Sequence, residues 1–269
     1  MDAIDAGDLL EVARRVADEA AGLAVRMRAD GVGEVDTKTT ETDVVTAADR
    51  AVERLVVSLL AEARPGDAVL AEESGAVRSE GGSRVRWILD PIDGTVNYVY
   101  GLPQYAVSLA AEVDGEVVAG VVGNPVTGEQ WYAAAGRGAY RGSRRLRCSP
   151  VTELGQTLVA TGFGYDARRR AHQAKVLAGL LPRVRDVRRL GAASLDLCFA
   201  AEGRVDAYFE KGLSPWDWAA GVLIAREAGL LVTGLAGRPA GDGFVVAAPP
   251  GVYQQLHDEL VALDAAGGP

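Results

Sequence analysis

The fold of this chain is decided by the stretch Trp87-Ile88-Leu89-Asp90-Pro91-Ile92-Asp93-Gly94-Thr95. A hydrophobic run, typical of a buried strand, is followed there by two residues with carboxylate side chains. Pro91 fixes its own φ and Gly94 tolerates a positive φ, so the chain can turn tightly and bring Asp90 and Asp93 to one point. Two converging carboxylates suit a hard divalent cation. The alternative interpretation is an aspartate-rich turn in which Asp90 is only a cap.

The residues after this turn predict a place for an anion. If residues 95–100 begin a helix, the N–H groups of Gly94 and Thr95 lie at its positive end. A phosphate group would then meet the metal-binding carboxylates at the same turn.

Two further blocks carry acidic residues next to predicted elements. Glu72 follows a short apolar run at 68–71, so an adjacent strand would bring it to the same sheet edge as Asp90; a solvated loop is the alternative. The sequence Ser214-Pro215-Trp216-Asp217 is typical of a helix start with Asp217 at the third position. Asp217 is therefore either a capping partner or a metal ligand, and its flanking tryptophans favour the ligand.

A fourth block runs from Lys38 to Asp49. Thr46 and Asp49 have the spacing of a capping box at a helix start, which is the purely structural interpretation of Asp49. Lys38 is one of three lysines in a chain that otherwise uses arginine, and this is a mild hint that it contributes to a site.

Composition limits the classes of function. The 269 residues are 48% hydrophobic and carry a formal net charge of −9, which disfavours nucleic acid as a partner and suggests that metal cations would bridge the protein to any phosphate. We expect no membrane segment, because no apolar run approaches 20 residues. The two cysteines form no CxxC pair, so we expect a cytoplasmic protein without disulfides.

Hydrophobic periodicity predicts mixed α/β architecture arranged as layered sandwiches. The expected helices are 4–28, 46–63, 166–181, 192–201, 215–228 and 251–263. The expected strands are 68–71, 85–89, 105–113, 117–122, 130–133, 158–161 and 205–209, with two more near 230 and at 244–247. A soft boundary near 148 divides the chain into an N-terminal half, 1–148, carrying most of the metal site and a C-terminal half, 149–269, carrying substrate-facing residues and Asp217. The arginine-bearing stretch 141–147 is expected to be a solvated loop.

Together the four blocks resemble the inositol monophosphatase family, within the lithium-sensitive, magnesium-dependent phosphatase superfamily, and bacterial members in particular. The resemblance covers nearly the whole chain and implies an α/β/α/β/α sandwich and a homodimer. It implies catalytic roles for Asp49, Glu72 and Thr95. It also implies that two or three Mg²⁺ ions are held by Glu72, Asp90, the carbonyl of Ile92, Asp93 and Asp217.

The resemblance also implies how a substrate would bind. Phosphate would lie at Gly94 and Thr95, and the alcohol would face Asp93, Gly191, Ala193, Glu210 and Asp217. The expected reaction is hydrolysis of inositol 1-phosphate by an activated water. Related phosphatases acting on fructose 1,6-bisphosphate, histidinol phosphate or 3′-phosphoadenosine 5′-phosphate are the close alternatives, and a non-catalytic regulatory binding protein is the alternative of another class.

Overall fold

The structure, a computed structural model, describes residues 4–31, 35–38, 44–77 and 82–269. Its main element is an eight-stranded sheet in the order β10-β9-β8-β7-β6-β5-β3-β4. Only β3 and β5 run parallel; the other neighbours are antiparallel. The strands are β3 (Ala68–Ala71), β4 (Gly75–Val77), β5 (Val85–Asp93), β6 (Ala106–Val113), β7 (Glu116–Asn124), β8 (Glu129–Ala134), β9 (Ala139–Arg141) and β10 (Arg144–Arg145). A separate hairpin pairs β1 (Val35–Thr37) with β2 (Val44–Thr46).

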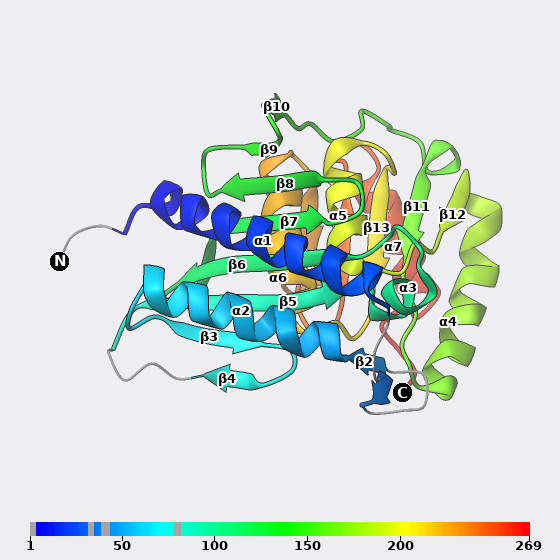
Figure 1. Ribbon diagram of the computed structural model, residues 1–269. Helices are drawn as coiled ribbons and strands as arrows, with labels where there is room; N and C mark the ends of the chain where they lie inside the picture. Colours follow the sequence, from blue (N-terminus) through cyan, green and yellow to red (C-terminus); the bar gives the residue numbers. More distant parts are fainter. Residues whose placement is uncertain (1–3, 32–34, 39–43, 78–81) are drawn as a thin grey trace.

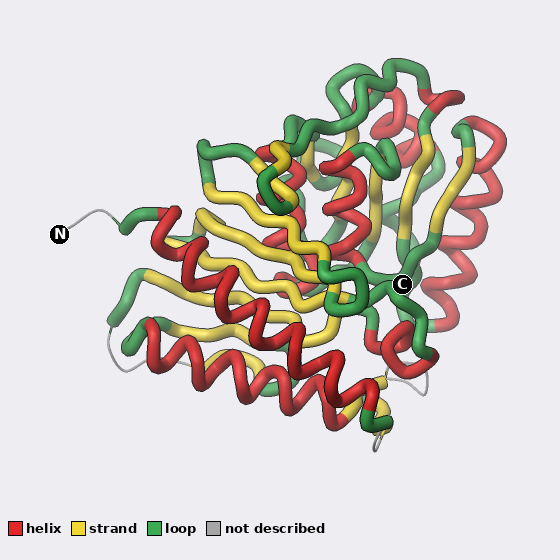
Figure 2. Tube along the Cα trace, turned by 45° about the horizontal axis from the view of Figure 1, so that its top comes forward, coloured by secondary structure: helices red, strands yellow, loops and turns green. Residues whose placement is uncertain are grey.

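Two long helices cover one face of this sheet (Figures 1 and 2). They are α1 (Ala6–Ala29) and α2 (Ala47–Ala63), and each buries an apolar stripe against the strands. Asp5 caps α1, and Thr46 begins α2 with the expected capping box. At the end of β5 the chain turns through Gly94 into the short helix α3 (Thr95–Tyr100).

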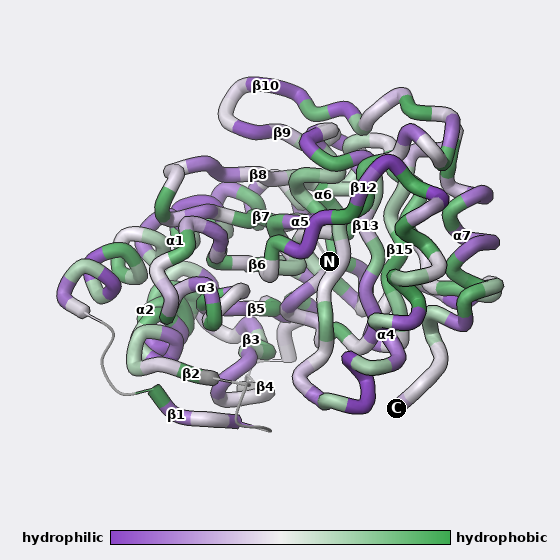
Figure 3. Tube along the Cα trace, turned by 90° about the vertical axis from the view of Figure 1, so that its right-hand side faces the viewer, coloured by the Kyte–Doolittle hydropathy of each residue, from purple (hydrophilic) through white to green (hydrophobic). Residues whose placement is uncertain are grey.

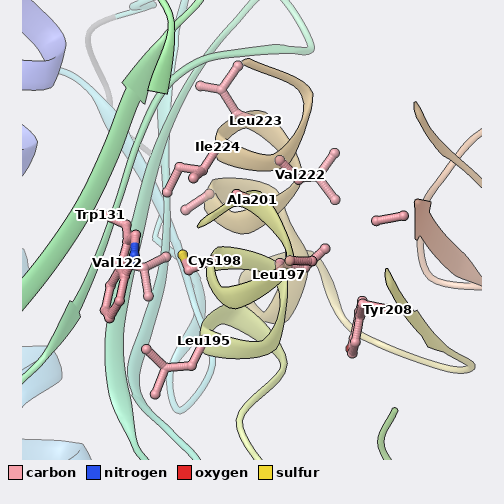
Figure 4. Close-up of a cluster of buried hydrophobic side chains, with 14 of the residues drawn as sticks. Val122, Trp131, Leu195, Leu197, Cys198, Ala201, Tyr208, Val222, Leu223 and Ile224 are labelled. Carbon is pink, nitrogen blue, oxygen red and sulfur yellow. The ribbon is translucent and has the colours of Figure 1, made fainter. Parts of the chain in front are cut away.

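A second pair of helices lies between two sheets. These are α5 (Ala193–Glu202) and α6 (Pro215–Glu227), and every residue of α5 is buried. Such all-round burial explains why their sequences carry no polar face. Figure 4 shows how Leu195, Cys198 and Ile224 from these helices meet Trp131 of the first sheet, while Tyr208 approaches from the second.

The second sheet has five strands in the order β12-β11-β13-β15-β14. They are β11 (Leu158–Thr161), β12 (Asp186–Arg188), β13 (Ala207–Glu210), β14 (Leu231–Thr233) and β15 (Val245–Ala248). The outer helices α4 (Ala167–Leu180) and α7 (Tyr253–Ala262) pack on its other face through a third core. Figure 3 shows the contrast between the hydrophobic β15 and the hydrophilic residues of α4. The molecule is thus an α/β/α/β/α sandwich, as expected.

The structure confirms the predicted helices and strands to within a few residues, but it corrects one prediction. Residues 141–147 are not simply a solvated loop, because β9 and β10 form a paired edge there. Arg141 reaches the buried Glu202, with a nitrogen–oxygen distance of 2.7 Å, which ties this edge to α5. Strands β1, β4 and β12 were not predicted from the sequence.

The central core draws side chains from both halves of the chain. The division at residue 148 falls between the last strand of the first sheet and the first strand of the second, and it stays a prediction. In the described part of the chain, no helix combines the length and apolar character needed to cross a bilayer.

Candidate active site

Strand register brings Glu72 next to Asp90. In the parallel pair β3–β5, Ala71 lies opposite Leu89, and the backbone N–H of Glu72 donates to the carbonyl of Leu89. The next residue on each strand is therefore an acid. The two carboxyl groups share a hydrogen bond, and Asp90 also accepts from the N–H of Ile92 at 3.0 Å.

An irregularity in β5 brings Asp93 to the same end of the sheet. The pairing of β5 with β6 shifts register between Asp90 and Asp93, as expected around Pro91. Asp93 then accepts from Ser194, at the start of α5, through the backbone N–H at 2.7 Å and the hydroxyl at 2.5 Å. Strand β5 is thereby attached to the start of α5.

Asp217 is a cap, but it is also part of the acidic cluster. Its carboxylate accepts from the N–H of Ser214 at 2.6 Å, as a capping residue would. Burial raises the pKa of Asp217, and the nearby charges of Asp93 and Glu72 raise it further. The two interpretations of Asp217 are therefore compatible.

The capping box at α2 is likewise connected to the turn after β5. One oxygen of Asp49 accepts from the N–H and the hydroxyl of Thr46, at 2.8 and 2.5 Å. The other lies 3.0 Å from the hydroxyl of Thr95, which is also 3.0 Å from the carbonyl oxygen of Ile92. Asp49 and Thr95 are both buried.

Lys38 also reaches this site. Its ammonium group lies 2.8 Å from a carboxylate oxygen of Glu72 and 2.5 Å from one of Glu73. Partial burial opposes its charge, but Glu72 and Glu73 outweigh that effect and raise the pKa of Lys38.

Burial dominates the electrostatics of the acidic cluster. Desolvation, together with repulsion from Glu72, Asp93 and Asp217, raises the pKa of Asp90 well above its ordinary value. Desolvation raises the pKa of Asp93 to about 6, although Ser194 opposes it. Crowded, buried negative charge of this kind is relieved by protons or by a cation.

The donor set fits a divalent cation such as Mg²⁺, because it consists of carboxylate and carbonyl oxygens. In the described part of the chain, however, no three acidic, histidine or cysteine side chains form a preassembled metal cluster. Protein donors engage one oxygen of each of three carboxylates: Lys38 holds Glu72, Ser194 holds Asp93, and Ser214 holds Asp217.

A cleft of about 150 Å³ lies beside the acidic cluster. Six of the residues expected to face substrate line it: Asp93, Gly94, Gly191, Ala193, Glu210 and Asp217. Desolvation raises the pKa of Glu210 to about 7, against a 2.7 Å hydrogen bond from the Tyr208 hydroxyl. Thr95 lies next to the cleft, at the start of α3, but is not part of its lining.

Sequence reasoning missed several residues of this site. Ser194 follows the predicted substrate-facing residues Gly191 and Ala193, and its hold on Asp93 depends on a contact across 101 positions of sequence. Arg169, Arg189 and Lys211 also line the cleft. Nothing in their local sequence distinguishes them from the chain's other basic residues, because only the folded chain brings the three side chains to one cleft.

Comparison with known proteins identifies the family of this chain. The profile of the inositol monophosphatase family matches residues 5–265. A protein of Mycobacterium bovis named inositol-1-monophosphatase is 48% identical, with 97% of this chain and 94% of that protein covered. A Vibrio cholerae protein named Nus factor SuhB is 41% identical over 72% of this chain and 73% of its own length.

Solved structures give the same result. The structure of Mycobacterium tuberculosis SuhB matches with a TM-score of 0.84 and 43% identity, covering 98% of this chain and all of that one. Sequence and fold thus agree, and this chain belongs to the inositol monophosphatase family of phosphatases.

Proposed function

We propose that this protein hydrolyses inositol 1-phosphate to inositol and phosphate in a Mg²⁺-dependent reaction. The observation that carries the proposal is the contact between Thr95 and Asp49, 3.0 Å apart, directly after the strand that bears Asp90 and Asp93. The name inositol-1-monophosphatase of the 48% identical relative supports the choice of substrate.

The chain's own residues supply the orientation of the attacking water. The Thr95 hydroxyl donates to Asp49, so its oxygen is free to accept a hydrogen bond from water and to direct the water's lone pair at phosphorus. Asp49 holds this hydroxyl rigidly because its second oxygen is fixed by Thr46. The water–phosphorus bond forms as the bond to the alcohol oxygen breaks; the proton that the water loses passes through the Thr95 hydroxyl to Asp49, and the departing oxygen takes up a proton from bulk water.

The phosphate and the alcohol would be held by separate groups. The N–H groups of Gly94 and Thr95 would bind phosphate, and Asp93, Gly191, Ala193, Glu210 and Asp217 would contact the alcohol. Glu72, Asp90, the Ile92 carbonyl, Asp93 and Asp217 would hold the metal. When bound, Mg²⁺ would neutralise charge on the phosphoryl oxygens and make the attacking water more acidic.

The test is phosphate release, with and without Mg²⁺, from inositol 1-phosphate, fructose 1,6-bisphosphate, histidinol phosphate and 3′-phosphoadenosine 5′-phosphate. We expect inositol 1-phosphate to be cleaved only when Mg²⁺ is present. If only another ester were cleaved, that ester would be the substrate in place of inositol 1-phosphate. If none of the esters released phosphate in a Mg²⁺-dependent way, the catalytic proposal would be overturned.

A regulatory binding role is a second candidate, because the V. cholerae relative is named as a Nus factor. The variant Asp93→Asn separates the two. As a phosphatase, the protein should lose turnover by orders of magnitude, whereas a binding role that does not use the cleft should survive in the folded variant.

We also propose that the protein works as a cytoplasmic homodimer with two or three Mg²⁺ ions per site and is inhibited by lithium. Analytical ultracentrifugation, Mg²⁺ titration calorimetry and phosphate release in lithium chloride test these points separately. A monomer, a single bound ion or resistance to lithium would each correct the corresponding part.

A further inference from the structure

Five arginines gather at the outer edge of the first sheet. Arg141 ends β9, Arg144 and Arg145 form β10, Arg147 follows β10, and Arg204 follows α5. We call these five residues the arginine edge. Strand β10 is the outermost strand, and β6, β7, β8 and β9 separate it from β5 and its carboxylates. The arginine edge is therefore a feature apart from the active-site cleft, in a protein whose net charge is −9.

One buried carboxylate holds three of these arginines in place. The side chain of Glu202 is only 3% exposed. Its oxygens lie 2.7 Å from Arg141, 3.3 Å from Arg204 and 3.4 Å from Arg144. The indole N–H of Trp131 donates to the same carboxylate at 2.9 Å. A buried charge with several donors fixes the groups around it, so these guanidinium groups are preorganised at the edge.

The nearby acids do not balance the arginine edge. Besides Glu202, Glu129 pairs with two of the same three arginines. A third acid, Glu227, accepts from backbone N–H groups of the turn before β9. Arg145 and Arg147 are exposed, and in the described part of the chain no carboxylate lies within 4 Å of either guanidinium group. The edge thus carries unbalanced positive charge.

Exposed arginines at the edge of the second sheet are balanced one by one. Strand β12 is an outermost strand of that sheet. Arg188 lies 2.7 Å from Asp186 of the same strand, and Arg183, just before it, lies 2.8 Å from Glu259 of α7. Unbalanced charge is therefore particular to the arginine edge and is not common to the exposed arginines of this protein.

The backbone of β10 leaves one side open. Arg144 pairs with Arg141 and Arg145 with Tyr140, both in β9, and no further strand pairs with β10 among the residues that the structure describes. Figure 1 shows β10 at the upper margin of the molecule. The free N–H and C=O groups of an edge strand can bind one more strand, and the side chains beside them decide which strand fits.

The charges select the kind of strand. A second copy of this edge would bring arginines next to arginines, which is unfavourable. A nucleic acid would extend past the arginine edge, over the surface of a protein with net negative charge. A short segment rich in Asp and Glu covers the edge alone, and its carboxylates match the planar donors of arginine.

We propose that the arginine edge binds an acidic, extended segment of a partner protein as a strand added to β10. The backbone of that segment would pair with β10, and its carboxylates would lie against the guanidinium groups of Arg144, Arg145 and Arg147. Because this surface lies outside the cleft, the inference does not depend on the proposed function.

The test measures, by fluorescence anisotropy, how a labelled peptide that repeats Glu-Glu-Thr binds to the full chain. We expect binding that weakens as the salt concentration rises, because exposed charges are screened. A peptide of the same length that repeats Glu-Glu-Pro carries the same charge, but proline lacks the N–H group that a paired strand needs. Its Kd should be higher by about fivefold or more. Equal Kd values for the two peptides would overturn the added strand.

The variant Arg145→Gln/Arg147→Gln removes two charges that contact no acid, so the buried Glu202 keeps its partners. The Kd of the Glu-Glu-Thr peptide should rise by about fivefold or more, since charge-assisted hydrogen bonds are lost. Arg183→Gln/Arg188→Gln, at the edge of the second sheet, is the matched control and should leave the Kd as in the wild type. Melting temperatures show whether each variant is folded. Equal losses of affinity in the two folded variants would mean that only net charge matters, and would overturn the site.

Two further results would overturn the proposal. Tighter binding of a single-stranded oligouridine of the same length would make this edge a nucleic-acid site instead of a protein-binding one. If neither peptide bound even at low salt, the arginines would only protect the strand edge from pairing.

Discussion

Asp49 uses its two carboxylate oxygens for different purposes. One oxygen caps α2 through Thr46, and the other receives the hydroxyl of Thr95. The spacing between Thr46 and Asp49 predicts only a capping box, yet Asp49 also fixes the Thr95 hydroxyl, which is the group proposed to orient water. The cap holds the carboxylate in place, and burial raises its pKa, which favours proton uptake.

The first prediction concerns the Thr95 hydroxyl. Thr95→Val should lower kcat by about a hundredfold or more, because a positioned proton acceptor typically contributes that much. Thr95→Ser keeps the hydroxyl and should retain most of the activity. Steady-state kinetics on inositol 1-phosphate decides this, and equal rates for the two variants would show that the hydroxyl does not orient the water.

The second prediction concerns Lys38, which binds Glu72 and Glu73 where a metal would bind. Lys38→Met removes a competing cation, so the Mg²⁺ concentration that gives half of the metal-induced rise in melting temperature should fall by about tenfold. Lys175→Met removes a positive charge from the exposed side of α4 and should leave this concentration unchanged. An identical Mg²⁺ dependence in both variants would mean that Lys38 does not compete.

At the scale of elements, the site depends on the junction between β5 and α3. Gly94 has a φ of 91°, and a Cβ there would lie 3.0 Å from the carbonyl oxygen of Gln104 and 3.1 Å from that of Gly191. Three segments meet so closely that only a residue without a side chain fits. This close approach places the loop before α5, with the residues proposed to contact substrate, next to the turn that bears the carboxylates.

Gly94→Ala should therefore lower the free energy of unfolding by about 3 kcal/mol, combining the cost of positive φ with overpacking. Gly115 provides the control: its φ is 92°, but a Cβ there would meet nothing within 4 Å. Gly115→Ala should cost only about 1–2 kcal/mol, from backbone conformation alone. Urea unfolding measures both values, and equal losses would show that the close packing at Gly94 contributes nothing.

The whole molecule determines how far the cleft is desolvated. The central core is built from α5, α6 and both sheets, and Glu210 lies at the end of β13 where this core reaches the cleft. Burial raises the pKa of Glu210 from 4.5 to about 7, so the folded protein binds a proton that the unfolded chain releases at lower pH. The stability from this proton is complete below pH 4.5 and is lost as the pH rises through 7.

Glu210→Gln removes this titration. In metal-free buffer between pH 5 and pH 7, the stability of the wild type relative to the variant should fall by on the order of 1 kcal/mol per pH unit. Glu116→Gln, in the exposed hairpin, should show the wild-type dependence. Denaturant unfolding at several pH values tests this, and parallel curves for the wild type and Glu210→Gln would contradict the raised pKa.

The sequence by itself determined the elements and the acidic groups of the site. Periodicity located the helices and most strands, since it reports which face of each element is buried. The pattern around Pro91 and Gly94 indicated where Asp90 and Asp93 converge, because proline fixes its own φ and glycine allows a positive φ. These are properties of short stretches of chain.

Only the tertiary structure decided what surrounds those groups. Ser194 binds Asp93, and Lys38 binds Glu72, through contacts between residues that are distant in the sequence. The approach of Arg169 and Lys211 in one cleft likewise depends on how α4 packs beside β13, and the edge strands β9 and β10 depend on a buried partner in α5. The burial of a residue and the charged groups around it are properties of the packed molecule, so no local sequence pattern encodes them.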